Sequence, residues 1–95
     1  MTAVEIVTIR PKHGALPRLL EIRPVLVSEY QARFPTVTAQ LFAQEDGTLV
    51  DIWTWPDRET AEGALADPTV SRTFTEEWQP LVDLISFAWA EPLAS

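Results

Sequence analysis

Residues 49–70, LVDIWTWPDRETAEGALADPTV, constrain the fold of this chain more than any other stretch. The first seven residues alternate as a strand, which places Asp51, Trp53 and Trp55 on one face and mostly apolar residues on the other. A proline ends the strand, and Asp57 is a good N-cap for a helix that follows it. Bulky aromatic residues on one strand face and apolar residues on the other predict a sheet that is covered on both sides.

The remaining sequence supplies the other elements of a small domain. Strands are predicted at residues 4–10, 36–44, 49–55 and 85–91, and helices at residues 17–34 and from residue 57 onward. The acidic turn at residues 45–47, EDG, lies between two strand patterns and indicates a hairpin. The second helix is predicted to break near Asp67, which would cap a new helical segment with Pro68 at its first position.

The predicted order of elements is β-α-β-β-α-β, in a single domain that covers residues 1–95. These parts make the ferredoxin-like arrangement of the α+β class, a four-stranded antiparallel sheet with both helices on one face. The other face of the sheet would be open in one copy of the chain. Since the strands carry apolar residues on both faces, we expect a homodimer that pairs through the open sheet face.

Composition and charge exclude several classes of function. Seven Lys and Arg residues against 14 Asp and Glu residues give a net charge of −7, which argues against a nucleic-acid partner. The absence of cysteine excludes a disulfide framework and a thiolate metal site. No apolar run is long enough for a membrane span and the first residues do not look like a signal peptide, so we expect a cytoplasmic protein with no membrane partner.

Residues 52–68, IWTWPDRETAEGALADP, resemble the antibiotic-biosynthesis-monooxygenase-like group of the dimeric α/β-barrel superfamily. The KHG turn at residues 12–14 and the EDGT turn at residues 45–48 add to the resemblance, which covers nearly the whole chain. It implies a ferredoxin-like subunit that pairs into a dimeric α/β barrel and uses no cofactor. The superfamily includes anthrone oxygenases, quinol oxygenases, haem-degrading enzymes and isomerases, so the resemblance predicts the fold better than the activity.

Comparison with these relatives residue by residue narrows the implied activity. Haem-degrading relatives use an Asn, a Trp and a His, and the corresponding residues here are Val7, Ala64 and Phe74. Haem degradation is therefore not implied. Anthrone-oxidising relatives use a Trp that corresponds to Trp55, and their Asn four residues earlier corresponds to Asp51. Their aromatic residue and Arg on the second helix are not retained.

Three residues are candidates for catalysis. Asp51 could act as a general base on a phenol or an acidic C–H group, and the alternative is an ion pair with Arg10 or another basic side chain. Trp55 could form the wall of a cavity for a flat aromatic compound, and the alternative is a core residue. His13 is either an acid–base group at the mouth of that cavity or an exposed turn residue. With one histidine and no metal-binding motif, no metal site is expected.

Five other residues are candidates for binding the substrate, and each could equally be a core or rim residue: Trp53, Tyr30, Arg72, Phe74 and Trp78. The first hypothesis is a cofactor-independent monooxygenase acting on a small aromatic, polyketide- or quinol-like compound. The second is a non-catalytic ligand-binding or structural homodimer with a degenerate site, and an isomerase or lyase is a third.

Overall fold

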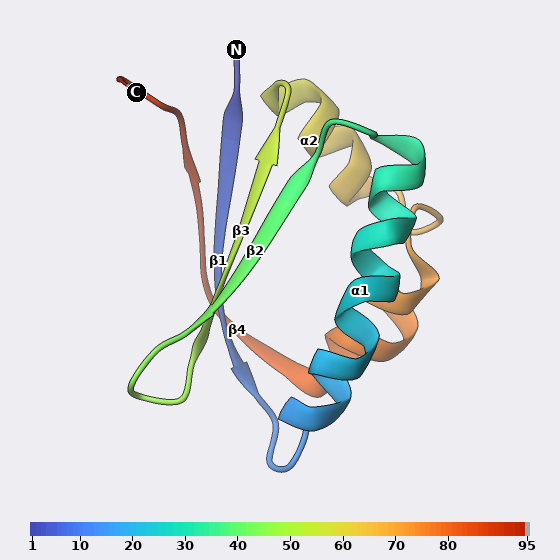
Figure 1. The fold of residues 1–95 in the computed structure, drawn as a ribbon, viewed down its shortest axis with the longest axis vertical. Coiled ribbons are helices and arrows are strands. Elements are labelled where there is room, and N and C mark those ends of the chain that lie inside the picture. The colour runs from blue at the N-terminus through green and yellow to red at the C-terminus, as the bar shows by residue number, and fades with distance from the viewer. Residues whose placement is uncertain (95) are drawn as a thin grey trace.

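A four-stranded antiparallel sheet carries one layer of helices in the computed structural model, which describes residues 1–94 (Figure 1). The elements are, in order, β1 (Ala3–Pro11), α1 (Leu16–Arg33), β2 (Thr38–Ala43), β3 (Leu49–Trp55), α2 (Arg58–Ala66), the π-helical turn η1 (Phe74–Trp78), the 3₁₀ turn η2 (Gln79–Leu81) and β4 (Val82–Ala90). The strand order across the sheet is β2-β3-β1-β4. The predicted ferredoxin-like fold is confirmed.

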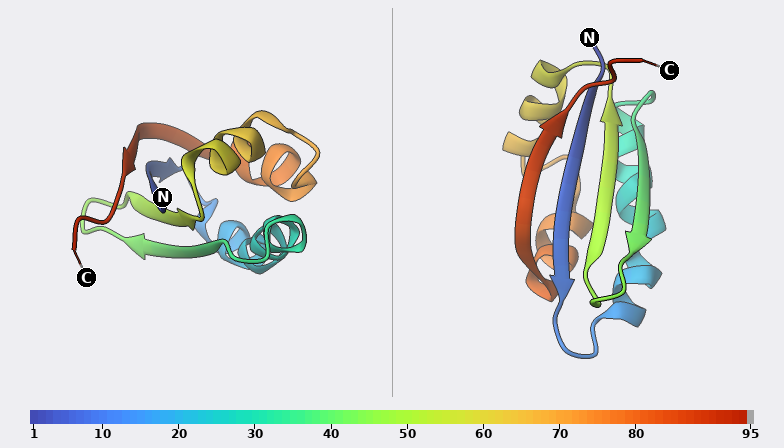
Figure 2. Two further views of the ribbon diagram at one scale, coloured as in Figure 1. Left: turned by 90° about the horizontal axis from the view of Figure 1, so that it is seen from above. Right: turned by 90° about the vertical axis from the view of Figure 1, so that its left-hand side faces the viewer.

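Successive side chains of the two central strands, β1 and β3, point alternately to the two faces of the sheet. Glu5 and Ile9 of β1 are buried against the helices, whereas Ile6 between them faces the other way and is paired with Ile52 of β3. Figure 2 shows that the helices lie on one face of the sheet only. Among residues 1–94, no helix covers the other face, and none is long and apolar enough to cross a membrane.

Helix α1 covers the sheet with one face. Its buried residues recur at intervals of three and four: Leu19, Ile22, Leu26 and Tyr30. Pro17 lies in the first turn, where its missing N–H group is not needed, and the exposed Pro24 faces solvent. The helix ends at Arg33, and the Phe34 N–H group donates to the Tyr30 carbonyl.

The hairpin between β2 and β3 forms at the predicted acidic turn. Gly47 has a positive φ of 87°, a conformation that residues with a Cβ atom rarely adopt. The Asp46 carboxylate accepts hydrogen bonds from the Thr48 N–H group at 3.0 Å and from the Thr48 hydroxyl at 2.6 Å. This local network sets the register in which β2 and β3 pair.

The chain after α2 differs from the prediction. Asp57 caps α2 as expected, accepting from the Thr60 N–H group at 2.7 Å. The prediction that Asp67 caps a new helix is wrong, because its carboxylate closes a tight turn by accepting from the N–H group and the hydroxyl of Thr69. Helical structure resumes after Ser71, whose hydroxyl accepts from the Phe74 N–H group at 3.0 Å.

Strand β4 begins at Val82, three residues before the predicted start. Residues 82–84 pair with the far end of β1, and the register shifts between Thr8 and Ile9, so that Ile85 has no partner residue. This β-bulge interrupts the alternation of side chains, and a strand prediction depends on that alternation. Leu84 before the bulge and Phe87 after it are paired with the helix-facing Ile9 and Val7, so both lie on the helix side of the sheet.

Candidate functional site

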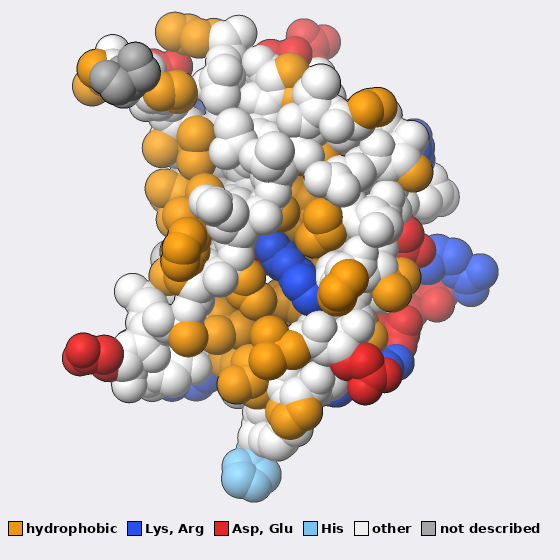
Figure 3. Space-filling view, viewed as in Figure 1, with side chains coloured by type: hydrophobic (Ala, Val, Ile, Leu, Met, Phe, Trp, Pro, Cys, Tyr) orange, Lys and Arg blue, Asp and Glu red, His pale blue; other side chains and the backbone are white. Residues whose placement is uncertain are grey.

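A cavity of about 310 Å³ lies between the sheet and the helices. Alternate residues of β1, β3 and β4 line one side, and residues of α1, α2 and η1 line the other. Hydrophobic side chains gather in the hollow between the sheet and α1 in Figure 3. The volume is at the small end of the range for ligand pockets, which suits a compact ligand of a few fused rings.

Aromatic rings form much of the cavity wall. Trp53 and Trp55 project from the same face of β3, with ring centroids 6.1 Å apart and planes at 23°. Tyr30 of α1 meets Trp53 edge to face at 5.0 Å, and it also contacts Phe74 of η1 at 6.2 Å. Edge-to-face pairs of this kind hold each ring at a defined angle. The wall is therefore a fixed surface against which a flat aromatic compound could stack.

A buried ion pair connects α1 to the sheet beside this wall. Two guanidinium nitrogens of Arg23 donate to the two carboxylate oxygens of Asp51, each at 2.6 Å, and the side chains are only 12% and 9% exposed. The guanidinium carbon lies 5.3 Å from the Trp53 ring and 5.4 Å from the Trp78 ring. Asp51 is thus paired with a basic side chain, as the alternative from the sequence had it; the partner is Arg23, while Arg10 donates to the Asp46 carbonyl.

Glu5 is a second buried carboxyl group in the cavity, and it has no cationic partner among residues 1–94. The Trp55 indole N–H group donates to it at 3.0 Å. Glu5 is opposite Trp53 in the register of β1 and β3, so Trp55 and Asp51 are its two diagonal neighbours. Burial raises the pKa of Glu5 to about 7, the Trp55 hydrogen bond opposes the rise, and the charge of Asp51 adds to it.

Tyr30 provides a hydroxyl group in the same cavity. Burial raises the pKa of Tyr30 to about 12, and the negative charges of Glu5 and Glu29 contribute to the rise. The hydroxyl therefore keeps its proton at neutral pH. It has no hydrogen-bond partner among residues 1–94. A hydroxyl in this state is ready to donate to an oxygen atom of a ligand.

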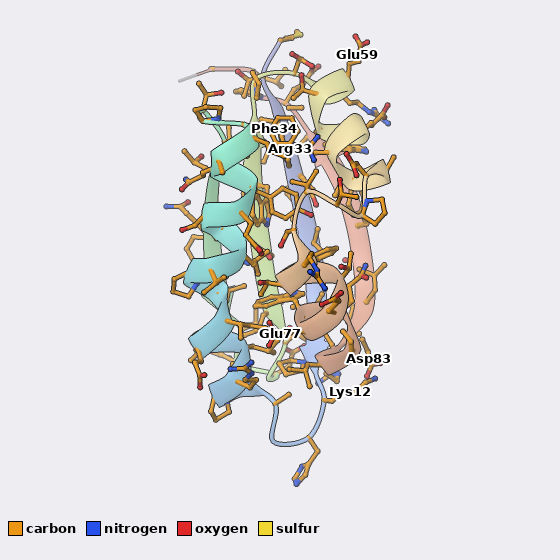
Figure 4. All side chains as sticks on the ribbon, turned by 90° about the vertical axis from the view of Figure 1, so that its right-hand side faces the viewer. Lys12, Arg33, Phe34, Glu59, Glu77 and Asp83 are labelled. Atoms are coloured by element: carbon orange, nitrogen blue, oxygen red, sulfur yellow. The ribbon has the colours of Figure 1, made fainter. Side chains whose placement is uncertain are left out.

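The turn η1 is held against α1 by polar contacts at several points. Glu29 of α1 accepts from the Ser71 hydroxyl at 2.8 Å and from the Thr73 N–H group at 3.3 Å. Near the C-terminal end of α1, Arg33 pairs with Asp67 at 3.2 Å (Figure 4). Beside the N-terminal half of α1, Glu77 of η1 pairs with Arg18 (Figure 4). These contacts fix where η1 places its aromatic side chains over the cavity.

The structure brings together most of the residues that the sequence suggested. Those that line the cavity are Asp51, Trp53, Trp55, Tyr30, Phe74 and Trp78. Arg72 and His13 do not line it. Arg72 points to solvent and pairs with Glu76, four residues along the same helical segment. His13 is exposed in the turn between β1 and α1, where the next residue, Gly14, has a φ of 75°.

Sequence reasoning missed two residues, Glu5 and Arg23, although the sequence holds a signal for each. Glu5 shares a strand face with Val7 and Ile9, so a carboxyl group is expected on an apolar face. Arg23 lies four residues after Leu19 and three before Leu26, within the apolar stripe of α1. A charged residue inside an apolar repeat is the pattern that would have identified both.

No group of three or more His, Asp or Glu side chains within residues 1–94 is arranged to hold a metal ion. The polar groups of the cavity are instead single carboxyl, hydroxyl and amide groups on apolar walls. The chemistry that this arrangement supports is proton transfer to or from an aromatic ligand.

Comparison with solved structures gives the same architecture at low sequence identity. A protein from Chloroflexus aurantiacus assigned as an antibiotic biosynthesis monooxygenase superposes with a TM-score of 0.73 at 15% identity, covering 100% of this chain and 96% of the other. A point mutant of SnoaB, a cofactor-independent oxygenase from Streptomyces nogalater, gives 0.74 at 20% identity, with 98% and 95% covered. Protein Atu4242 from Agrobacterium tumefaciens gives 0.69 at 21% identity, with 95% and 92% covered.

These likenesses establish the fold. At this level of identity they do not carry an activity from one protein to another. No protein-family model matches the chain, and no curated protein matches it significantly. The function is therefore inferred from the cavity and its side chains.

Replacing Glu5 by Gln will change how stability depends on pH. The folded protein binds the Glu5 proton more tightly than the unfolded chain, so this stabilisation is present below about pH 4.5 and is lost as pH rises through about 7. Between these limits, the free energy of unfolding of the wild type should fall relative to Glu5→Gln by up to about 3 kcal/mol. Urea unfolding across this range measures the difference. The exposed Glu45→Gln variant is the control and should follow the wild type.

Replacing Asp51 by Asn will destabilise the protein, because it leaves the Arg23 guanidinium buried without an opposite charge. We expect a loss of about 3–5 kcal/mol in the free energy of unfolding. Replacing both residues by apolar ones, as Arg23→Met with Asp51→Leu, should cost less than the single change. Glu76→Gln, which breaks an exposed pair with Arg72, should cost less than about 1 kcal/mol. Equal losses for Asp51→Asn and Glu76→Gln would show that the buried pair is not needed.

Proposed function

We propose that the chain is a small cofactor-independent monooxygenase that binds a flat aromatic, polyketide- or quinol-like compound in the cavity and uses Glu5 as its base. The observation that carries the proposal is a buried carboxyl group with a pKa of about 7, placed among aromatic rings. A group with this pKa is ionised in part at neutral pH and can both accept and return a proton.

Glu5 is a better candidate for the base than Asp51. Both oxygens of Asp51 accept hydrogen bonds from Arg23, whereas Glu5 accepts from Trp55 through one oxygen only. In this proposal Asp51 is a positioning residue that holds Arg23 between two indole rings. Its negative charge also adds to the rise in the pKa of Glu5 that burial mainly causes.

The proposed reaction begins when Glu5 removes a proton from a phenol or from an activated C–H group of the substrate. The Tyr30 hydroxyl donates to the oxygen on which negative charge develops. The resulting electron-rich anion reduces molecular oxygen, and the substrate supplies all the electrons. For a CH₂ group between two aromatic rings, CH₂ and O₂ become C=O and H₂O, so one oxygen atom enters the product and the other leaves as water. The names of two structural neighbours, which describe oxygenases, support this reaction class.

Oxygen uptake with anthrones and hydroquinones as substrates tests the proposal. The protein, treated with a chelator, should consume oxygen, with kcat/KM rising with pH and levelling off above about pH 7 as Glu5 ionises. Glu5→Gln should lower kcat by about 10²-fold or more, and Glu45→Gln should not change it. Binding of these compounds without any oxygen uptake would contradict the proposal and favour a non-catalytic ligand-binding protein.

We also propose that a second copy of the chain covers the open face of the sheet. Apolar residues lie on this face on three neighbouring strands: Ile6 on β1, Ile52 on β3 and Phe42 on β2, which is 48% exposed. Ile6 and Ile52 are directly paired, so the apolar surface is continuous across β1 and β3, and Phe42 extends it on β2 opposite Val50. An apolar face of this kind is stabilised by burial against a matching face.

Replacing Ile52 by Asp should separate the proposed dimer. Light scattering after gel filtration should give the wild type twice the mass of one chain and Ile52→Asp the mass of one chain. Leu20→Asp places the same charge on an exposed residue on the outer side of α1 and should leave the mass unchanged. Circular dichroism confirms that each variant is folded. A wild type with the mass of one chain would overturn the proposal.

A further inference from the structure

The cavity has an unusual balance of charge. The charged residues that line it are both acidic, Glu5 and Asp51. The guanidinium group beside the cavity, that of Arg23, uses two of its nitrogens to bind Asp51. The remaining polar lining residues, Tyr30 and Gln79, are neutral. Within the part of the chain that the structure describes, a ligand therefore meets one carboxyl group whose charge nothing balances, and no free cation.

This balance opposes an anionic ligand for two physical reasons. A carboxylate entering the cavity would lose its hydration against the indole rings of Trp53 and Trp55 without gaining an ion pair. The carboxylate would also approach the like charge of Glu5, and the repulsion is weakly screened because the Glu5 residue is only 5% exposed.

The same residues favour a neutral ligand that carries a hydrogen-bond donor. Ionised Glu5 retains an oxygen that does not bind Trp55 and can accept from an O–H or N–H group. The Tyr30 hydroxyl can donate to a carbonyl or phenolic oxygen nearby. The exposed part of the cavity lining agrees with this selection, because it includes apolar side chains: Leu65, Leu84 and Phe87, which are 39%, 64% and 42% exposed.

We infer that Glu5 makes the cavity selective for uncharged, donor-bearing aromatic compounds and excludes their carboxylates. This inference rests on one part of the proposed function, namely that the ligand binds in the cavity. It defines the substrate class more narrowly: a neutral phenol, quinol or amide on a compact ring system is accepted, whereas the corresponding free acid is rejected. A reaction that supplies this substrate must therefore have removed or esterified any carboxyl group attached to the rings.

Two probes of nearly equal shape separate charge from size: 2-naphthamide, which is neutral and donates hydrogen bonds, and 2-naphthoate, which is an anion. Their dissociation constants are measured by titration calorimetry at about pH 8, where Glu5 is ionised. The wild type should bind the amide at least about tenfold more tightly than the carboxylate. In Glu5→Gln this preference should fall to about threefold or less, and in Glu45→Gln it should remain as in the wild type.

Each other outcome has a definite meaning. Equal affinity of the wild type for the two probes overturns the inference and leaves the oxygenase proposal standing. A preference that Glu5→Gln does not reduce also overturns it, because the charge of Glu5 is then not its cause. If neither probe binds, both the inference and the proposal that the cavity is a ligand site are overturned. Selective binding of the amide without oxygen uptake from any anthrone or hydroquinone supports the inference and overturns only the oxygenase proposal.

Discussion

The ion pair between Arg23 and Asp51 is the interaction on which the rest of the cavity depends. It connects the middle of α1 to the middle of β3, two elements that have no other buried polar contact of this kind among residues 1–94. Removing two charges from water is costly, and here two hydrogen bonds and the faces of two indole rings offset that cost. The pair therefore fixes the distance between helix and sheet, and it occupies the cation that could otherwise neutralise Glu5.

The register of the sheet determines what surrounds Glu5. Because Glu5 is opposite Trp53, the diagonal positions bring one hydrogen-bond donor and one negative charge toward its carboxyl group. A shift of the register by one residue would turn every one of these side chains to the other face. The hairpin that fixes β3, with its glycine at positive φ, thus contributes to the chemistry of a residue about 40 positions earlier in the chain.

The sequence was sufficient to predict the order of elements and the faces of the central strands. Alternation of side chains placed Asp51, Trp53 and Trp55 together on one face of β3, and the structure shows that this face is the one beneath the helices. The start of β4 was not predictable, because a bulge at Ile85 breaks the alternation. Glu5 and Arg23 were missed because the environment of a buried charge depends on residues far along the chain, 28 positions away for the ion pair. His13 and Arg72, two other candidates from the sequence, are exposed and do not line the cavity, since proximity in sequence does not determine where a side chain points.

The π-helical turn η1 holds one residue more than an α-helical turn would, because the Gln79 N–H group bonds to the Phe74 carbonyl five residues earlier. One residue added to a regular α-helix would rotate everything after it by about 100° relative to what precedes it. The wider turn absorbs the added residue, and Phe74 and Trp78 at its two ends both line the cavity. A protein of this fold with an ordinary α-helix here could therefore present equivalent side chains from a segment one residue shorter. In a sequence alignment of this chain with such a protein, the residues after the turn are therefore matched correctly only if a one-residue gap is placed within the turn.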